Sequence, residues 1–145
     1  YACGDVESEA LFEDRLFIAW PGDRSPPEHA TADTIDQAGL LLLEDGHCLK
    51  DHALAACNRP ELRASATMLG TSLHTLIQMV DNGLGQTLIP EIAVKNGLLN
   101  GTEVLARPLD APHASREIAL VWRTNSPRQP EFELLAETMR ELVEA

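Results

Sequence analysis

Short apolar runs, each closed by turn-forming residues, recur along the chain. The first, at residues 16–20, ends at Pro21-Gly22, and an unbroken run of four leucines follows at residues 40–43. Runs of this length are typical of strands, and an unbroken apolar run is typical of a strand that is covered on both faces. We expect strands at residues 16–20, 40–43, 86–90, 104–105 and 117–122, and a brief apolar segment near residues 67–69.

Between these runs the apolar positions recur at helical spacing. Helices are predicted at residues 32–38, 48–57 and 91–96, from a Thr71-Ser72 cap to Asn82-Gly83, and after a turn at Ser126-Pro127. Two of these helices carry an apolar face, which consists of Leu73, Leu76, Ile77 and Val80 in one and of Phe132, Leu135, Met139, Leu142 and Val143 in the other. Alternating strands and helices predict an α/β fold with a largely parallel sheet.

The composition is that of a folded domain with a strong acidic bias. Of the 145 residues, 44% are hydrophobic, and no apolar run approaches the roughly 20 residues that a membrane helix needs. The formal net charge of −12 and the lack of a Lys/Arg cluster argue against DNA binding by this chain alone, because a phosphate backbone would repel it. The length predicts one compact unit or part of a larger one.

The chain begins at Tyr1-Ala2-Cys3-Gly4, without an initiator Met, a basic segment or an apolar leader. We therefore expect this N-terminus to be a cut, and we expect no secretory signal. Three cysteines, an odd number, do not make a disulfide scaffold, and the cytoplasm would keep structural thiols reduced. The expected location is cytoplasmic, and any disulfide is expected to be regulatory.

Cys48 is the residue with the strongest signal for chemistry. It lies at the start of a predicted helix and directly after His47, and both the helix N-terminus and the imidazole favour the reactive thiolate. Lys50 adds positive charge, while Asp45 and Asp51 oppose it. If peroxide oxidised Cys48 to a sulfenic acid, the second thiol, nine residues on, could close a disulfide.

Helix geometry puts a condition on that disulfide. Across one regular helix, Cys48 and Cys57 would be separated by about 13.5 Å of rise and about half a turn. A disulfide needs Cα atoms within roughly 7 Å. The bond therefore requires the helix to unwind or its ends to move, which is how a conformational switch works.

Several alternatives remain open at this point. Spacing alone favours two inert core cysteines over a redox pair. A zinc site built from His47, Cys48, His52 and Cys57 ranks below the thiol switch, because Cys57 lies on the opposite side of the predicted helix. A thiol peroxidase would use the same steps with turnover, and a module binding an organic ligand would make the cysteines incidental.

The segment from Leu43 to Asp51, with Cys57 nine residues after Cys48, resembles the signature of the OxyR family of peroxide-responsive LysR-type regulators. Residues 71–80 and 83–90 resemble the second helix and strand of LysR-type effector domains generally. The resemblance implies a periplasmic-binding-protein-like (type II) fold with an almost complete second subdomain, residues 15–116. Residues 1–14 and 117–145 would form part of the first subdomain, and the winged helix-turn-helix that binds DNA would be absent from this chain.

The resemblance also implies residue roles. Cys48 would be the peroxidatic cysteine and Cys57 the resolving one, with His47, Asp51 and Arg116 around the reactive thiol. Thr71 and Ser72 match the edge of the effector cleft, whereas Cys3 has no assigned role.

The implied protein is a redox-sensing activator of antioxidant genes rather than an enzyme, without a metal, another cofactor or a membrane partner. Its implied partners are hydrogen peroxide, a second copy in a homodimer or homotetramer, and a thiol reductant such as glutaredoxin or thioredoxin. Promoter DNA and RNA polymerase would be contacted only through the full-length protein.

Overall fold

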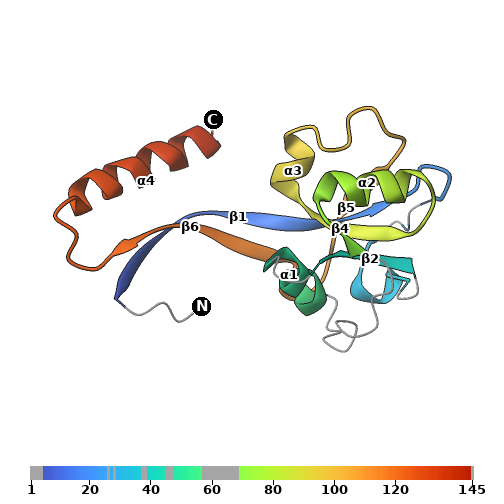
Figure 1. The fold of residues 1–145 in the computed structure, drawn as a ribbon, viewed down its shortest axis with the longest axis horizontal. Helices are drawn as coiled ribbons and strands as arrows, with labels where there is room; N and C mark the ends of the chain where they lie inside the picture. Colours follow the sequence, from blue (N-terminus) through green and yellow to red (C-terminus); the bar gives the residue numbers. More distant parts are fainter. Residues whose placement is uncertain are drawn as a thin grey trace. The chain divides into compact units, whose positions relative to one another are not determined.

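The structure is a computed structural model that describes residues 5–25, 27, 29–36, 39–44, 48–56 and 69–144, without the side chains at positions 48, 50 and 52 (Figure 1). The chain divides into two compact units. Unit 1 consists of Tyr1–Asp14 and Glu117–Ala145, and unit 2 consists of Arg15–Arg116.

Six strands form one mixed sheet in the described part of the chain. They are β1 (Val6–Trp20), β2 (Leu40–Leu43), β3 (Leu69–Gly70), β4 (Gln86–Pro90), β5 (Leu105–Pro108) and β6 (Ser115–Arg123). The order is β3-β2-β4-β1-β5, and β6 pairs with β1. β2 is parallel to β3 and β4, whereas β1 is antiparallel to both β4 and β5.

The prediction of a largely parallel sheet is therefore only half right. Helical crossovers impose a common direction on the strands that they connect, and β2, β3 and β4 follow that rule. β1 precedes the first crossover and inserts between β4 and β5, so nothing in the connections prevents it from running the opposite way.

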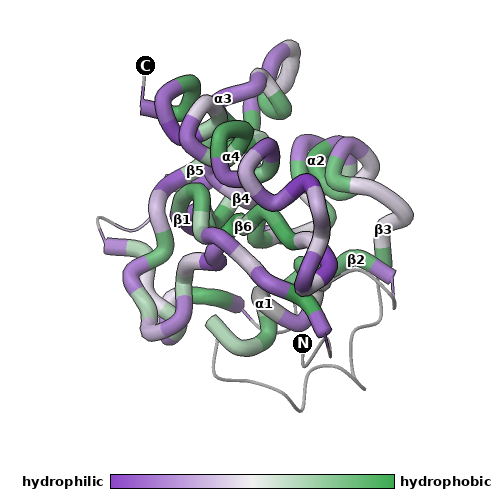
Figure 2. The backbone as a smooth tube through the Cα atoms, turned by 90° about the vertical axis from the view of Figure 1, so that its left-hand side faces the viewer, coloured by the Kyte–Doolittle hydropathy of each residue, from purple (hydrophilic) through white to green (hydrophobic). Residues whose placement is uncertain are grey.

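The helices of unit 2 cover both faces of its sheet. α2 (Leu73–Asp81) and α3 (Glu91–Lys95) lie on one side, and α1 (Cys48–Ala56) lies on the other (Figures 1 and 2). All residues of β2 and β4 are buried, and Figure 2 shows the leucines of β2 as a continuous hydrophobic stretch. The predicted strands at 40–43 and 86–90 and the predicted capped helix after Ser72 are confirmed.

Other elements differ from the sequence expectation. Over the described residues, the helix predicted at 32–38 is a single 3-10 turn, η1 (Ala32–Thr34), because the backbone at Ile35 is already extended and ends it. β1 begins ten residues earlier than expected, since its first half alternates acidic residues that have low strand propensity. β5 and β6 also extend beyond the predicted bounds.

The core of unit 2 is dense, and its buried polar side chains have partners. Thr87 Oγ1 donates a 2.9 Å hydrogen bond to the carbonyl of Leu41, and Gln86 Nε2 donates a 3.2 Å bond to the carbonyl of Asp36. Backbones approach closely where β4 begins, since a Cβ on Gly85 would lie 2.2 Å from the carbonyl oxygen of Gly39. The two hydrogen bonds thus satisfy the buried side chains of Thr87 and Gln86 within unit 2.

Unit 1 combines the first half of β1, most of β6 and α4 (Gln129–Glu144). The rings of Trp122 and Phe132 stack at 5.7 Å. Arg140 Nε donates a 2.9 Å hydrogen bond to the carbonyl of Ala10, and its guanidinium forms an ion pair with Glu9. Among the described residues, none of the helices is long and apolar enough to cross a membrane.

Candidate functional site at the carboxyl ends of the parallel strands

The carboxyl ends of three parallel strands meet at one edge of the sheet in unit 2. β2 and β3 are in register at Leu42–Leu69 and Leu43–Gly70, and the Glu44 amide then donates a 3.1 Å hydrogen bond to the Gly70 carbonyl. α1 follows β2, α2 follows β3 and α3 follows β4 directly. Three helix N-termini therefore begin near this edge, which is where open α/β sheets bind their ligands.

Cys48 is the first residue of α1. The helix spans Cys48–Ala56, so the predicted helix starting at Cys48 is confirmed over the described residues. Its inward face, formed by Leu49, Ala53, Leu54 and Ala56, is buried, whereas Asp51 in the first turn is exposed. The backbone at Cys48 thus lies at the positive end of a helix that is anchored to the sheet.

Ser72 caps α2. Its Oγ accepts a 3.2 Å hydrogen bond from the Thr75 amide, and its backbone is extended, as an N-cap residue requires. Both Thr71 and Ser72 are exposed at the same sheet edge as the start of α1. The sequence prediction that this pair caps a helix is confirmed for Ser72.

The structure describes only some of the remaining predicted site residues. Arg116 is the second residue of β6, half-buried and already engaged with a partner. Cys3, His47 and Cys57 lie outside the described residues, as do the side chains of Cys48 and His52. The predicted contacts between the two thiols, and the alternative zinc ligands, thus lie outside what the structure describes.

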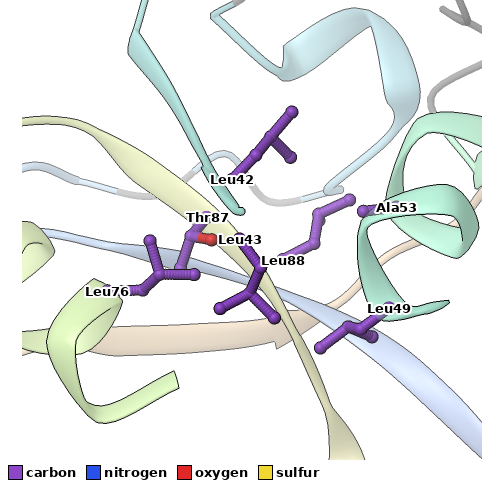
Figure 3. Close-up of a pocket in the computed structure, with 7 residues that line it drawn as sticks. All are labelled: Leu42, Leu43, Leu49, Ala53, Leu76, Thr87 and Leu88. Carbon is purple, nitrogen blue, oxygen red and sulfur yellow. The ribbon is translucent and has the colours of Figure 1, made fainter. Parts of the chain in front are cut away.

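Sequence inspection missed a small cavity beside α1. It has a volume of only about 10 Å³ and is lined from four elements by Leu42, Leu43, Leu49, Ala53, Leu76, Thr87 and Leu88 (Figure 3). The spacing of Leu49 and Ala53 indicates that they share a helix face, but a void depends on how side chains from separate elements meet.

Sequence inspection also missed Asp14, which is buried at the end of the first segment of unit 1. This carboxylate has an interaction partner, as buried charges require. Asp14 lies two residues from both Phe12 and Leu16, but the predicted strand began only at residue 16, so the sequence did not separate Asp14 from the other acids of the same strand, which are half-buried or exposed.

The chain matches the family model of the LysR substrate binding domain over residues 4–144. It is 39% identical over 140 residues to the HTH-type transcriptional regulator EstR of Acinetobacter baylyi, covering 95% of this chain and 44% of that protein. It is 40% identical over 146 residues to a probable hydrogen peroxide-inducible genes activator of Streptomyces viridosporus, covering 95% of this chain and 45% of that protein. The chain thus spans less than half of the length of these curated relatives.

The reduced form of the regulatory domain of OxyR2 from Vibrio vulnificus has a similar fold. The TM-score is 0.86 at 34% sequence identity, and the match covers 98% of this chain and 68% of that one. The α/β fold is therefore the periplasmic-binding-protein-like fold of LysR regulatory domains. The chain belongs to the LysR substrate-binding domain family and, within that family, groups with the OxyR-type regulatory domains.

Proposed function

We propose that this chain is the peroxide-sensing part of an OxyR-type transcriptional activator, with Cys48 as the sensing thiol. The observation that carries the proposal is the position of Cys48 as the first residue of α1, at the carboxyl end of β2. A helix N-terminus stabilises a thiolate, which is the form of cysteine that reacts with peroxide. The names of the relatives as hydrogen peroxide-inducible activators support the same chemistry.

The proposed reaction consumes one peroxide and two thiols. The Cys48 thiolate attacks one peroxide oxygen, the O–O bond breaks, and the departing hydroxide takes up a proton to become water. The Cys57 thiolate then attacks the sulfur of the sulfenic acid, and a second hydroxide leaves as the S–S bond forms. Two electrons pass from the two sulfurs to the peroxide, and the products are one disulfide and two waters.

Closing that bond has to remodel α1. The helix spans Cys48–Ala56, so a thiol at position 57 on a continuation of it would lie about 13.5 Å along the axis from Cys48. Disulfide geometry allows roughly 7 Å between Cα atoms. Oxidation would therefore dismantle part of α1, and that change would be the signal passed to the rest of the regulator.

The supporting residues are proposed from the family pattern. His47, Asp51 and Arg116 would surround the reactive thiol, and Thr71 and Ser72 would border the effector cleft at the same sheet edge. Unit 2 would be regulatory subdomain II, which carries the switch, and unit 1 would be part of regulatory subdomain I. No metal or other cofactor is needed for the steps proposed.

The proposals on location, oligomeric state and partners concern the full-length protein, because this chain matches less than half of the length of its curated relatives. We propose a cytoplasmic regulator that acts as a homodimer or homotetramer and is reset by a thiol reductant such as glutaredoxin or thioredoxin. A DNA-binding domain elsewhere in the full-length protein would contact promoter DNA and RNA polymerase, as the relatives' names as transcriptional regulators suggest. The protein would be a stoichiometric sensor rather than an enzyme.

Peroxide treatment followed by peptide mass mapping tests the proposal. In a Cys3→Ser background we expect a Cys48–Cys57 crosslink together with a loss of helical circular dichroism. Cys57→Ser is the matched control, because it should stop the reaction at a sulfenic acid on Cys48 that a sulfenic-acid probe can trap. An unchanged spectrum and the absence of a crosslink would contradict the proposal.

Two further measurements separate the alternatives. A thiol peroxidase would consume many equivalents of peroxide per chain when a reductant is supplied, whereas the proposed sensor would not. A module that recognises an organic ligand at the edge near Thr71 and Ser72 would keep its transcriptional response in a Cys48→Ser variant of the full-length protein. Loss of that response is the result expected for a peroxide sensor.

A further inference from the structure

Unit 2 contains three Asn-Gly dipeptides, at Asn82-Gly83, Asn96-Gly97 and Asn100-Gly101. In such a dipeptide the backbone nitrogen of the glycine can attack the side-chain amide carbon of the asparagine, because glycine has no side chain that hinders the approach. All three asparagines are exposed, so their access to water does not distinguish them. Their hydrogen bonds do distinguish them.

The first two dipeptides end α2 and α3, and hydrogen bonds hold both of their reacting groups. Nδ2 of Asn82 and Nδ2 of Asn96 each donate a 2.7 Å bond to the carbonyl four residues earlier. The amides of Gly83 and Gly97 donate bonds of 2.9 Å and 3.0 Å to the carbonyl three residues earlier. Attack by either glycine nitrogen would therefore require two hydrogen bonds to open first.

The third dipeptide lies in the turn that follows α3 (Figure 1). The side chain of Asn100 folds back over Gly97, where an added Cβ would lie 2.6 Å from Nδ2. The space beside Gly101 is open, since no atom lies within 4 Å of an added Cβ. Within the part of the chain that the structure describes, neither the Asn100 side chain nor the Gly101 amide has a hydrogen-bond partner.

We propose that Asn100-Gly101 is a site of spontaneous deamidation in the folded protein, and that Asn82 and Asn96 are protected by their hydrogen bonds. The inference does not depend on the proposed redox function. The Gly101 nitrogen attacks Cγ of Asn100 and loses its proton, the Cγ–Nδ2 bond breaks, and Nδ2 leaves as ammonia. Water then opens the succinimide ring to aspartate or isoaspartate. One water is consumed, one ammonia is released, and nothing is oxidised or reduced.

Both products change the turn. Each adds one negative charge, and isoaspartate also adds one atom to the backbone between residues 100 and 101. The Thr102 amide donates a 3.2 Å hydrogen bond to the Leu99 carbonyl across this position, so the longer backbone should disturb that bond. The next amide, of Glu103, donates a 2.9 Å bond to Asp81 Oδ1, and the disturbance should reach this contact with α2.

Peptide mass mapping of the chain during incubation at mildly alkaline pH tests the proposal. In the folded chain, deamidation at Asn100 should be about tenfold or more faster than at Asn82 and Asn96, because the bonds at those two residues must open first. In urea that unfolds the chain, the three rates should be similar, because each asparagine is followed by glycine. Equal rates in the folded chain, or no reaction at Asn100 there, would overturn the inference.

Two controls show that the reaction occurs in the folded state. Asn100→Gln should abolish the fast reaction, because a glutamine side chain would have to close a larger ring, and it should leave the rates at Asn82 and Asn96 unchanged. Urea below the unfolding transition raises the unfolded population, so it should accelerate Asn82 and Asn96 more than Asn100. Equal acceleration at all three residues would mean that Asn100 reacts only after unfolding, and the inference would be wrong.

Discussion

Helices α2 and α4 both have an apolar stripe in their sequences, but α2 buries its stripe and α4 leaves much of its stripe exposed. In α2, Leu76, Ile77 and Val80 are all at most 1% exposed, because the helix packs on the sheet of unit 2. In α4, Leu135 and Leu142 of the predicted stripe are 46% and 73% exposed, and Ala136 is the one buried residue of the described helix. An apolar stripe therefore predicts which face of a helix can be buried, but it does not predict that another part of the same chain covers that face.

The same contrast separates the two units. The hydrophobic core of buried residues is built from residues of unit 2. The described contacts of unit 1 include one ring stack, a 3.2 Å hydrogen bond from Trp122 Nε1 to Glu7, the Arg140 contacts and the pairing of its strands. Burial of apolar area contributes roughly 25 cal/mol per Å², so most of the stability of the described chain should come from unit 2. The predictions below test this difference, beginning with the largest effect.

The same substitution in each unit should have very different costs. Leu41→Ala removes a side chain that is 1% exposed at the centre of β2, and it should lower the free energy of unfolding by about 2–5 kcal/mol. Leu142→Ala removes a side chain that is 73% exposed, and the change should stay within about 0.5 kcal/mol. Urea denaturation followed by circular dichroism measures both. Similar losses in the two variants would show that the comparison between the units is wrong.

Close backbone approach in unit 2 gives the next largest effect. Gly85→Ala would place a Cβ 2.2 Å from the Gly39 carbonyl oxygen, and relieving that clash should cost about 1–3 kcal/mol. Gly83→Asn is the control, because Gly83 has a positive φ of 76° that Asn tolerates, and no atom lies within 4 Å of its added Cβ. Thermal unfolding should show the smaller loss for Gly83→Asn, and the reverse order would contradict the tight contact between residues 39 and 85.

The sequence predicted local elements better than the way in which they meet. The runs at 40–43 and 86–90 and the capped helix after Ser72 followed from periodicity and capping chemistry, both of which are local. The antiparallel placement of β1 was missed because strand direction depends on contacts between segments far apart in the chain. For the candidate site, the start of α1 at Cys48 was predictable, whereas the cavity beside Leu49 was not, since a void has no sequence signal.

A third prediction concerns the attachment of α4 within unit 1. Arg140→Ala removes the 2.9 Å hydrogen bond to the Ala10 carbonyl and the ion pair with Glu9, whose side chains are about one-third exposed. The expected cost is about 1 kcal/mol, confined to unit 1. Amide hydrogen exchange should accelerate in α4 and remain unchanged in β2 and β4. Arg140→Lys should recover only part of the protection, because the single nitrogen of an ammonium cannot reach both partners as the Nε and Nη2 of the guanidinium do. Unchanged exchange in α4 would mean that other contacts hold the helix.

The smallest effect is expected at the start of α4. Arg128 Nε donates a 2.7 Å hydrogen bond to Glu131 Oε2, and this bond, together with the charge of Glu131, raises the pKa of Arg128 above its ordinary value. When folding raises the pKa of a cation, the stability that it adds is present below the unfolded-state pKa and is lost only at higher pH. Because the ordinary pKa of arginine is far above neutral, the contribution of this pair to the free energy of unfolding should not change between about pH 6 and pH 9. Both side chains are more than 60% exposed, and solvent screens such a pair.

Glu131→Gln should therefore leave the Tm unchanged within error at low and at high salt, because an exposed ion pair contributes very little to the free energy of unfolding. The matched variant is Glu133→Gln, which removes the same charge two residues further along α4, where Glu133 accepts a hydrogen bond from Gln129. A Tm loss for Glu131→Gln as large as that for Arg140→Ala, and absent in Glu133→Gln, would show that unit 1 depends on its surface ion pairs as much as on the contacts beneath α4. The difference between the units would then lie in the kind of interaction that holds each of them as well as in the number of buried side chains.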